Sequence, residues 1–217
     1  MNNTLLYVIL PLSIIAMFAG TIMAIYEKDI KRLLAHSSVA QIGYITLAFA
    51  IGTKASIAAG FIHMFNHAII KGGLFIAITS LGFFIQKRVT INNLSGLGRA
   101  MPITFVCFVL CSLSLAGLPL TAGFISKLYL IKATISSDAI WIAILILISS
   151  ALSVVYLWKM IEVMWMREGR KIVIKENPTI YISLIIITFF NIYFGLDASL
   201  VVNVSFEAAE KLIGDLK

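Results

Sequence analysis

Three side chains that can carry a proton are spaced four residues apart in one of the most apolar stretches of the chain: His63, His67 and Lys71. Residues four apart lie on the same face of an α-helix, and eight residues span about 12 Å of its axis. An ionisable group deep in a membrane costs on the order of 3 kcal/mol, so such groups usually face a cavity and mark an ion path. The column therefore favours a proton relay over a set of structural polar contacts.

A second candidate region contains Gly117, Pro119 and Gly123 between two apolar runs that are each short for a membrane crossing. Proline removes a backbone donor and disfavours helix in the residue before it, whereas glycine permits a turn. The segment is either a tight loop between two spans or a break in one discontinuous helix near 115–136. Broken helices expose backbone dipoles where ions pass. Lys127 follows the break by one turn and is a candidate for the same pathway.

Composition indicates that these residues belong to a membrane protein. The chain has 217 residues, of which 60% are hydrophobic and only 12% are charged, whereas soluble domains carry about 25% charged residues. The apolar residues form blocks of roughly 15 to 30, long enough for helices to cross a bilayer. The alternating pattern of a barrel strand is absent, so we expect an all-α, multi-pass membrane protein.

The expected fold has about six or seven transmembrane helices in one domain, residues 1–202, followed by a short amphipathic tail, 203–217. The chain lacks an obvious basic start or cleavage site, so the first apolar run is interpreted as a retained span. The expected spans are 5–26, 38–52, 56–86, 102–117, 121–136, 139–166 and 179–202.

Basic residues in short loops account for much of the net charge of +7, as is typical of membrane proteins rather than nucleic-acid-binding ones. The loops with Lys28, Lys31 and Arg32 and with Lys87, Arg88 and Arg99 are separated by two spans and share a side, expected to be the cytoplasm. The third basic loop, 167–175, joins them only if 102–136 crosses once. Charge bias favours one crossing and segment lengths favour two, so the sequence leaves this open.

The sequence shows no catalytic site for chemistry on a small molecule. Cys107 and Cys111 are the only cysteines, and they are interpreted as packing residues within an apolar run. No cluster of metal ligands accompanies them, and no nucleophile with a base, phosphate-binding loop or haem-ligand pattern is present. We expect neither a cofactor nor a metal, and no enzymatic activity of the chain by itself.

Three motifs resemble the antiporter-like subunits found in respiratory complex I (its membrane subunits L, M and N), in Mrp-type cation/proton antiporters and in membrane-bound hydrogenases. Their order and spacing agree with that family over about residues 5–166. The segment VVYLWKMIEVMW and the tail NIYFGLD look most similar to the D-type subunit of Mrp antiporters. The three motifs are GTIMAIYEKDIKRLLAHSSVAQIGY (20–44), FIHMFNHAIIKGGLF (61–75) and SLAGLPLTAGFISKLYL (114–130).

In this family, buried lysines, histidines and one acidic residue carry protons along the membrane midplane. The resemblance implies that Lys127 is the terminal residue of that pathway, where some relatives have glutamate. His36 stands where relatives usually have tyrosine; it is either neutral or an auxiliary titratable group beside Lys31. The residues matched to the pathway are Lys31, His63, His67, Lys71 and Lys127.

Family members are about twice as long and contain two inverted helical repeats. The chain resembles the second repeat, and the first, with its buried glutamate and its own broken-helix lysine, is expected to be missing. We therefore expect one half of a split subunit, with another chain supplying the first repeat, or a truncated relic. Other membrane subunits of the assembly are expected partners, in a bacterial inner membrane.

Three functions follow from the resemblance. The leading one is a proton-translocating subunit of a multisubunit Na⁺/H⁺ antiporter, similar to the Mrp D-type subunit. The second is a proton-pumping membrane subunit, N-like or M-like, of an NADH–quinone oxidoreductase. The third is a relic that transports nothing.

Overall fold

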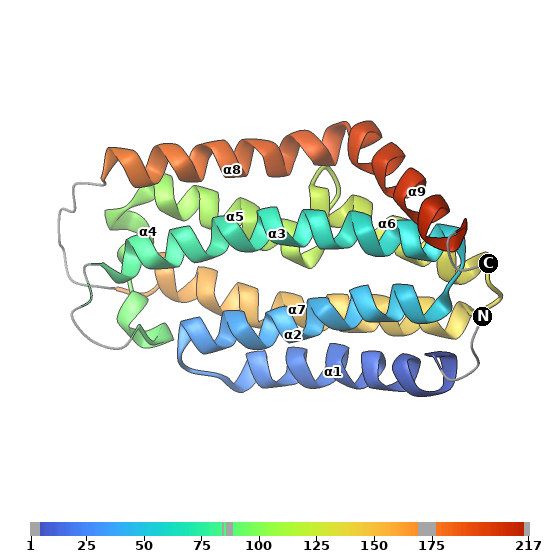
Figure 1. Ribbon diagram of the computed structural model, residues 1–217. Helices are drawn as coiled ribbons and strands as arrows, with labels where there is room; N and C mark the ends of the chain where they lie inside the picture. Colours follow the sequence, from blue (N-terminus) through green and yellow to red (C-terminus); the bar gives the residue numbers. More distant parts are fainter. Residues whose placement is uncertain (1–4, 84, 86–88, 169–176, 215–217) are drawn as a thin grey trace.

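The computed structural model describes residues 5–83, 85, 89–168 and 177–214. These residues form a bundle of long helices that lie roughly alongside one another, with α1 at one side and α8 at the opposite side (Figure 1). The helices are η1 (Leu5–Ile9), α1 (Leu10–Tyr26), α2 (Ile30–Ile51), α3 (Lys54–Gly82), η2 (Ile91–Leu94), α4 (Leu97–Ala100), α5 (Pro102–Ala116), α6 (Ala122–Ile135), α7 (Ile140–Trp165), α8 (Pro178–Leu196) and α9 (Ser199–Gly214).

The all-α, membrane-spanning class expected from composition is confirmed. Within the described residues, five helices are long and apolar enough to cross a membrane, namely the one ending at Tyr26, α2, α3, α7 and α8. A bent pair, 91–100 with 102–116, meets at 119° and would make a sixth candidate. Several expected details lie outside the described residues: Lys87, Arg88, Arg170 and Lys171 of the basic loops, residues 84 and 86 of the third span, and 215–217 of the tail.

The second span begins earlier than the sequence suggested. Residues 30–37, expected in a charged loop, form the first two turns of α2. The Asp29 carboxylate accepts hydrogen bonds from the backbone N–H groups of Lys31 and Arg32 and so caps the helix. Lys31 and Arg32 therefore stand on the first turn of a helix rather than before it.

The last expected span, 179–202, is two helices. α8 ends at Leu196, and α9 starts at Ser199 at an angle to it (Figure 1). Asp197 makes the corner, because its carboxylate accepts hydrogen bonds from both the backbone N–H and the hydroxyl of Ser199. α9 then packs on the start of α3, where Lys54 and Glu210 form an ion pair at 2.7 Å.

The contacts of α5 and α6 with α3 resolve the question of one or two crossings. Cys111 of α5 lies against Gly73 in the second half of α3. Ala122, at the start of α6, accepts a hydrogen bond from Asn66, further back along α3. The two helices, about 22 and 21 Å long for 15 and 14 residues, therefore run in succession along α3. Together they cross once, with a break in the middle.

One broken crossing brings the basic connections to the same end of the bundle. The backbone N–H of Ile91 donates to the carbonyl of Lys28, and that of Gly96 donates to Val163 near the end of α7. The connections that carry Lys28 and Arg99 and the start of the third basic loop at Arg167 therefore meet at one end. The excess of positive charge predicts that this end faces the cytoplasm.

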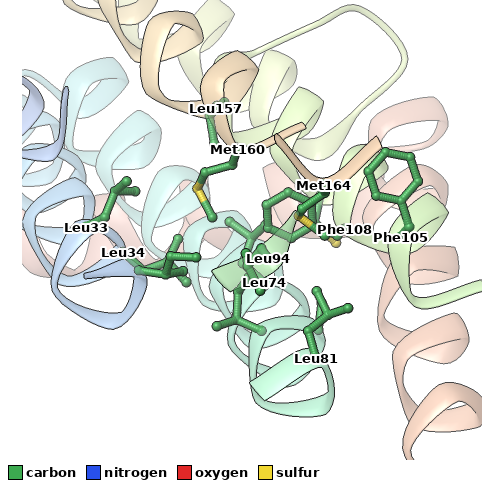
Figure 2. Close-up of a cluster of buried hydrophobic side chains, with 14 of the residues drawn as sticks. Leu33, Leu34, Leu74, Leu81, Leu94, Phe105, Phe108, Leu157, Met160 and Met164 are labelled. Carbon is green, nitrogen blue, oxygen red and sulfur yellow. The ribbon is translucent and has the colours of Figure 1, made fainter. Parts of the chain in front are cut away.

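The largest cluster of buried apolar residues among the described residues lies toward the same end. Figure 2 draws part of it. The cluster joins side chains from α2, α3, α5 and α7 with the short η2 helix of the α3–α5 connection. Cys107 and Cys111, expected to be packing residues, lie buried in this cluster. Its members drawn in Figure 2 include Leu33, Leu34, Leu74, Leu81, Leu94, Phe105, Phe108, Leu157, Met160 and Met164.

The break between α5 and α6 is held in a tight conformation. Gly117 has a φ of +90° and Leu120 a φ of +69°. This left-handed backbone conformation is strained for any residue that has a side chain. A Cβ added at Gly123 would stand 1.8 Å from the carbonyl oxygen of Ser114. The Ser114 hydroxyl accepts a hydrogen bond from the Gly123 N–H and donates to the side-chain oxygen of Asn191 on α8. The close backbone contact and the two hydrogen bonds of Ser114 thus hold the break in this conformation.

Gly123→Ala tests this packing. The added methyl group displaces α6 from α5, and we expect a loss of stability of about 3 kcal/mol, at the upper end for overpacked sites. The measurement is thermal unfolding of the purified, detergent-solubilised assembly. Gly214→Ala is the matched control, because a Cβ there meets no atom within 4 Å. Equal melting temperatures for the two variants would contradict the close contact between α5 and α6.

Candidate functional site

Lys127 closes the broken end of α5. Its buried ammonium donates hydrogen bonds to the carbonyls of Leu115 and Ala116, at 2.9 and 3.0 Å, and to the hydroxyl of Ser150 on α7 at 2.7 Å. An ammonium has three hydrogens, and all three find acceptors here. The Ser150 hydroxyl in turn donates to Ala116. A cation at the carbonyl end of a helix is also favoured by the helix dipole.

Lys71 occupies a similar site on the other side of the histidines. Its ammonium donates to the carbonyl of Leu34, at 2.7 Å, and to the hydroxyl of Ser37 on α2. The Ser37 hydroxyl donates to the same Leu34 carbonyl. The ring of Phe75 lies 6.0 Å from the ammonium, measured to the ring centroid. Lys71 thus has fewer acceptors than Lys127.

His63 is buried and held at both ring nitrogens. Nδ1 is 2.9 Å from the hydroxyl oxygen of Ser126 on α6, and Nε2 is 3.1 Å from the side-chain oxygen of Gln41 on α2. The Ser126 hydroxyl also lies 3.0 Å from the Gly123 carbonyl, at the first turn of α6. His63 therefore links α2 and α3 to the helix that begins at the break.

His67 continues the column toward Lys71. Its ring is stacked on that of His63, with the centroids 6.4 Å apart and the planes 9° from parallel. Its Nδ1 atom is buried and has no hydrogen-bond partner among the described residues. Both ring nitrogens of His63 face Ser126 and Gln41, so no direct hydrogen bond joins the two histidines.

Tyr44 bridges the column and Lys127. Its ring lies edge-on to that of His63, with centroids 5.5 Å apart, and its face is 5.6 Å from the Lys127 ammonium. An ammonium over an aromatic face is attracted by the ring's negative π surface. Tyr44 is buried and comes from the same face of α2 as Gln41.

The two buried ammonium groups have no carboxylate partner within the described part of the chain. The ion pairs found there involve other residues, such as Lys54 with Glu210 and Arg167 with Glu162. Carbonyls, hydroxyls and aromatic faces replace the counter-ion. A buried charge without a counter-ion is costly unless hydrogen bonds compensate it, and these contacts supply them.

Lys31 and His36 are not part of this cluster. Lys31 is exposed on the first turn of α2, one turn before Leu34, whose carbonyl binds Lys71. The His36 imidazole faces Glu27, with Nε2 3.7 Å from the carboxylate. That carboxylate accepts hydrogen bonds from the backbone N–H groups of Asp29 and Lys28, which lower the pKa of Glu27. The structure thus brings His63, His67, Lys71 and Lys127 together and leaves Lys31 at the edge.

Sequence reasoning missed the partners of these residues. Gln41, Tyr44 and Ser37 lie in the segment SSVAQIGY, and Ser126 lies next to Lys127, so the motifs contained them without identifying their roles. The spacing of Ser37, Gln41 and Tyr44 by four and three residues was an available signal of one helical face. Ser150 belongs to none of the three motifs.

Curated relatives resemble most of this chain but are much longer. The F(420)H(2) dehydrogenase subunit N of Methanosarcina mazei is 35% identical over 162 residues, covering 71% of this chain and 33% of the relative. The NADH-quinone oxidoreductase subunit N of Desulforudis audaxviator is 40% identical over 144 residues, covering 66% and 28%. The uncharacterized protein MJ1309 of Methanocaldococcus jannaschii is 32% identical and covers 94% and 44%. The chain thus spans between about a quarter and a half of the relatives it matches.

Solved structures share the fold of this chain. A membrane-bound sulfane sulfur reductase, an archaeal respiratory membrane complex, contains a chain with a TM-score of 0.88 and 29% identity; the match covers 96% of this chain and 42% of that one. The Mrp complex of Dietzia sp. DQ12-45-1b gives a TM-score of 0.86, with 94% and 46% covered. At 23% identity, that second likeness shows the fold alone.

The family assignment comes from residues 1–153, which match the model described as NADH:quinone oxidoreductase/Mrp antiporter, transmembrane. The matched region contains the histidine column, the broken crossing and both buried lysines. This multi-pass membrane chain belongs to the NADH:quinone oxidoreductase/Mrp antiporter transmembrane family.

Proposed function

We propose that the chain is a proton-translocating membrane subunit of a multisubunit assembly of the Mrp and complex I type, without a catalytic site of its own. The observation that carries the proposal is the pair of buried ammonium groups, Lys71 and Lys127, on either side of two histidines. Neither ammonium has a carboxylate partner among the described residues, so each can lose its proton without leaving a buried anion behind. Such groups inside a membrane are typical of ion paths.

The proposed path runs along α3 and then across to the break. Lys71, His67 and His63 follow one another at helical spacing, and Tyr44 and Ser126 connect His63 with the surroundings of Lys127. Proton transfer requires a hydrogen bond or a bridging water. The stacked rings of His63 and His67 have no direct hydrogen bond, so water has to carry the proton between them. Lys31 would extend the path toward the end of the bundle that carries most of the basic connections.

The remaining length of the relatives is part of this proposal. The matched region covers 33% of the Methanosarcina mazei relative and 28% of the Desulforudis audaxviator one. We propose that the complementary half of the pathway comes from outside these 217 residues, on the same polypeptide or on another chain. Further membrane subunits complete the assembly.

Two finer assignments differ in what drives the protons. Motif similarity alone suggested the D-type subunit of an Mrp-type Na⁺/H⁺ antiporter. The names of two curated relatives support the other candidate, because one is subunit N of a dehydrogenase and the other is subunit N of an oxidoreductase. We favour a subunit N-like role, in which electron transfer on partner subunits causes proton movement through this chain.

Lys127→Ala tests the proton path. The substitution removes the titratable group at the break, and we expect proton flux to fall at least tenfold while the assembly remains intact. The measurement is proton movement into inside-out vesicles that contain the chain together with the products of its neighbouring genes. Lys71→Ala is expected to behave in the same way.

Lys132→Ala is the matched control, because it removes an exposed cation from the same helix as Lys127. Its flux should equal that of the wild type. Wild-type flux in both Lys71→Ala and Lys127→Ala vesicles would refute the relay.

The choice between the two driving forces has its own test. If the chain acts as a subunit N, an electron donor such as NADH should start proton uptake in the vesicles, and sodium should have no effect on a preformed pH gradient. Rapid collapse of the gradient on addition of sodium chloride, with no response to a reductant, would instead assign the chain to a cation/proton antiporter. Lys127→Ala vesicles serve as the blank in both assays.

A further inference from the structure

The hydrogen bonds around His63 specify which of its nitrogens exchanges a proton. The atom facing Nε2, at 3.1 Å, is the carboxamide oxygen of Gln41, which only accepts hydrogen bonds. Nε2 therefore has to carry a hydrogen. The atom facing Nδ1, at 2.9 Å, is a hydroxyl oxygen, which both donates and accepts. The two sides of the ring are chemically different.

The Ser126 hydroxyl has two possible acceptors for its single hydrogen. One is Nδ1 of His63, at 2.9 Å, and the other is the carbonyl of Gly123, at 3.0 Å. When His63 is neutral, the hydroxyl donates to Nδ1. When His63 is protonated, Nδ1–H donates to the hydroxyl oxygen, and the hydroxyl hydrogen turns to Gly123. Both charge states keep every ring nitrogen hydrogen-bonded, and no heavy atom moves.

This arrangement matters because the ring is buried. Leaving a buried donor unpaired costs about 1–3 kcal/mol. A fixed acceptor at Nδ1 would favour only the protonated ring, and a fixed donor only the neutral one. A hydroxyl that rotates serves both, so neither state is penalised by a missing hydrogen bond.

We propose that Gln41 and Ser126 are positioning residues that fix Nε2 as a permanent N–H donor and make Nδ1 the nitrogen at which His63 gains and loses its proton. The inference rests on the proposed proton-translocating function. In the step, the Ser126 hydroxyl passes its hydrogen to Nδ1 while its oxygen takes one proton from a hydronium ion; an N–H bond forms, the serine O–H bond is replaced, and a water molecule is left. Exchange therefore takes place on the α6 side of the ring, toward the break, and the α2 side stays closed.

The charged and titratable groups around the ring come from three helices. His67 stacks on it from α3, and Tyr44 lies edge-on from α2. Lys127 of α6 follows Ser126 in the chain, and its ammonium lies over the ring of Tyr44. A positive charge on His67 or Lys127 repels a positive charge on His63. The orientation of the Ser126 hydroxyl, which follows the charge of His63, therefore depends on whether these neighbours carry a proton.

The direct test is ¹⁵N NMR of the histidine-labelled assembly in lipid, with the His63 signal assigned by its loss in His63→Asn. We expect neutral His63 to be protonated at Nε2 in the wild type. In Gln41→Leu the acceptor at Nε2 is gone, and the neutral ring should change to the Nδ1–H tautomer, which donates to Ser126. Gln41→Glu should keep the Nε2–H form, because its carboxylate still accepts.

A neutral His63 protonated at Nδ1 in the wild type, or the same tautomer in wild type and Gln41→Leu, would overturn the proposal. A role of Gln41 in packing alone predicts no change of tautomer. The spectrum does not depend on transport. The tautomer assignment is therefore decided even if the vesicles show that the chain moves no protons, which would refute only the proposed function.

Flux measurements test Ser126 independently. Ser126→Ala leaves Nδ1–H of the protonated ring without an acceptor, and we expect proton flux to fall about tenfold, the factor that corresponds to about 1.4 kcal/mol. Ser126→Thr keeps a hydroxyl and should restore most of the flux. Ser136→Ala, at the exposed end of α6, is the matched control. Equal flux in Ser126→Ala and Ser136→Ala, or no difference between the alanine and threonine variants at position 126, would contradict the switch.

Discussion

The site depends on one constraint. A helix that ends inside a membrane leaves its last backbone carbonyls without hydrogen-bond donors. α5 ends at Ala116 halfway through a crossing, and hydrocarbon offers its last carbonyls no water. The Lys127 ammonium and the Ser150 hydroxyl supply the missing donors. The break thus stabilises a cation in the middle of the bundle, and the cation stabilises the break. In the proposed pathway the same lysine is both a structural cap and the group that exchanges protons.

The unbroken helix α3 lies opposite the break and carries the histidines that face it. α3 runs for 29 residues past both α5 and α6 and carries the histidine column on the way. Asn66 of α3 donates to the carbonyl of Ala122 and so fixes the first turn of α6 in register with the column. His63 consequently faces Ser126, one residue before Lys127. The polar residues gather around a rigid helix on one side and a broken one on the other.

α2 provides the third side of the site through a single face. Leu34, Ser37, Gln41 and Tyr44 follow one another at three- and four-residue spacing, which places them along one stripe of the helix. The first two bind the Lys71 ammonium, the third accepts from His63, and the fourth lies between His63 and Lys127. Because α2 and α3 run antiparallel, the stripe matches the column in reverse order. Carbonyl and hydroxyl oxygens from this stripe take the place of a carboxylate.

Much of the fold could be predicted because membrane burial acts on each segment separately. A run of about 20 apolar residues is a span whatever its neighbours are, so the class and most spans were correct. The two wrong boundaries depended on polar residues whose role is contextual. Asp29 extends α2 by capping it, and Asp197 ends α8 by binding Ser199. Charged residues near a helix end look the same in a sequence whether they belong to the loop or to the first turn.

The sequence by itself determined which residues share a helical face, because that depends only on the 3.6-residue repeat. It therefore identified His63, His67 and Lys71 as a column and Lys127 as a residue one turn after a segment rich in glycine and proline, which could be a loop or a helix break. Only the tertiary structure decided that 102–136 crosses once, that Gln41 and Ser126 hold opposite sides of His63, and that Lys31 lies at an exposed edge. These facts depend on contacts between residues tens of positions apart. Such contacts arise from the packing of whole helices, which no local spacing encodes.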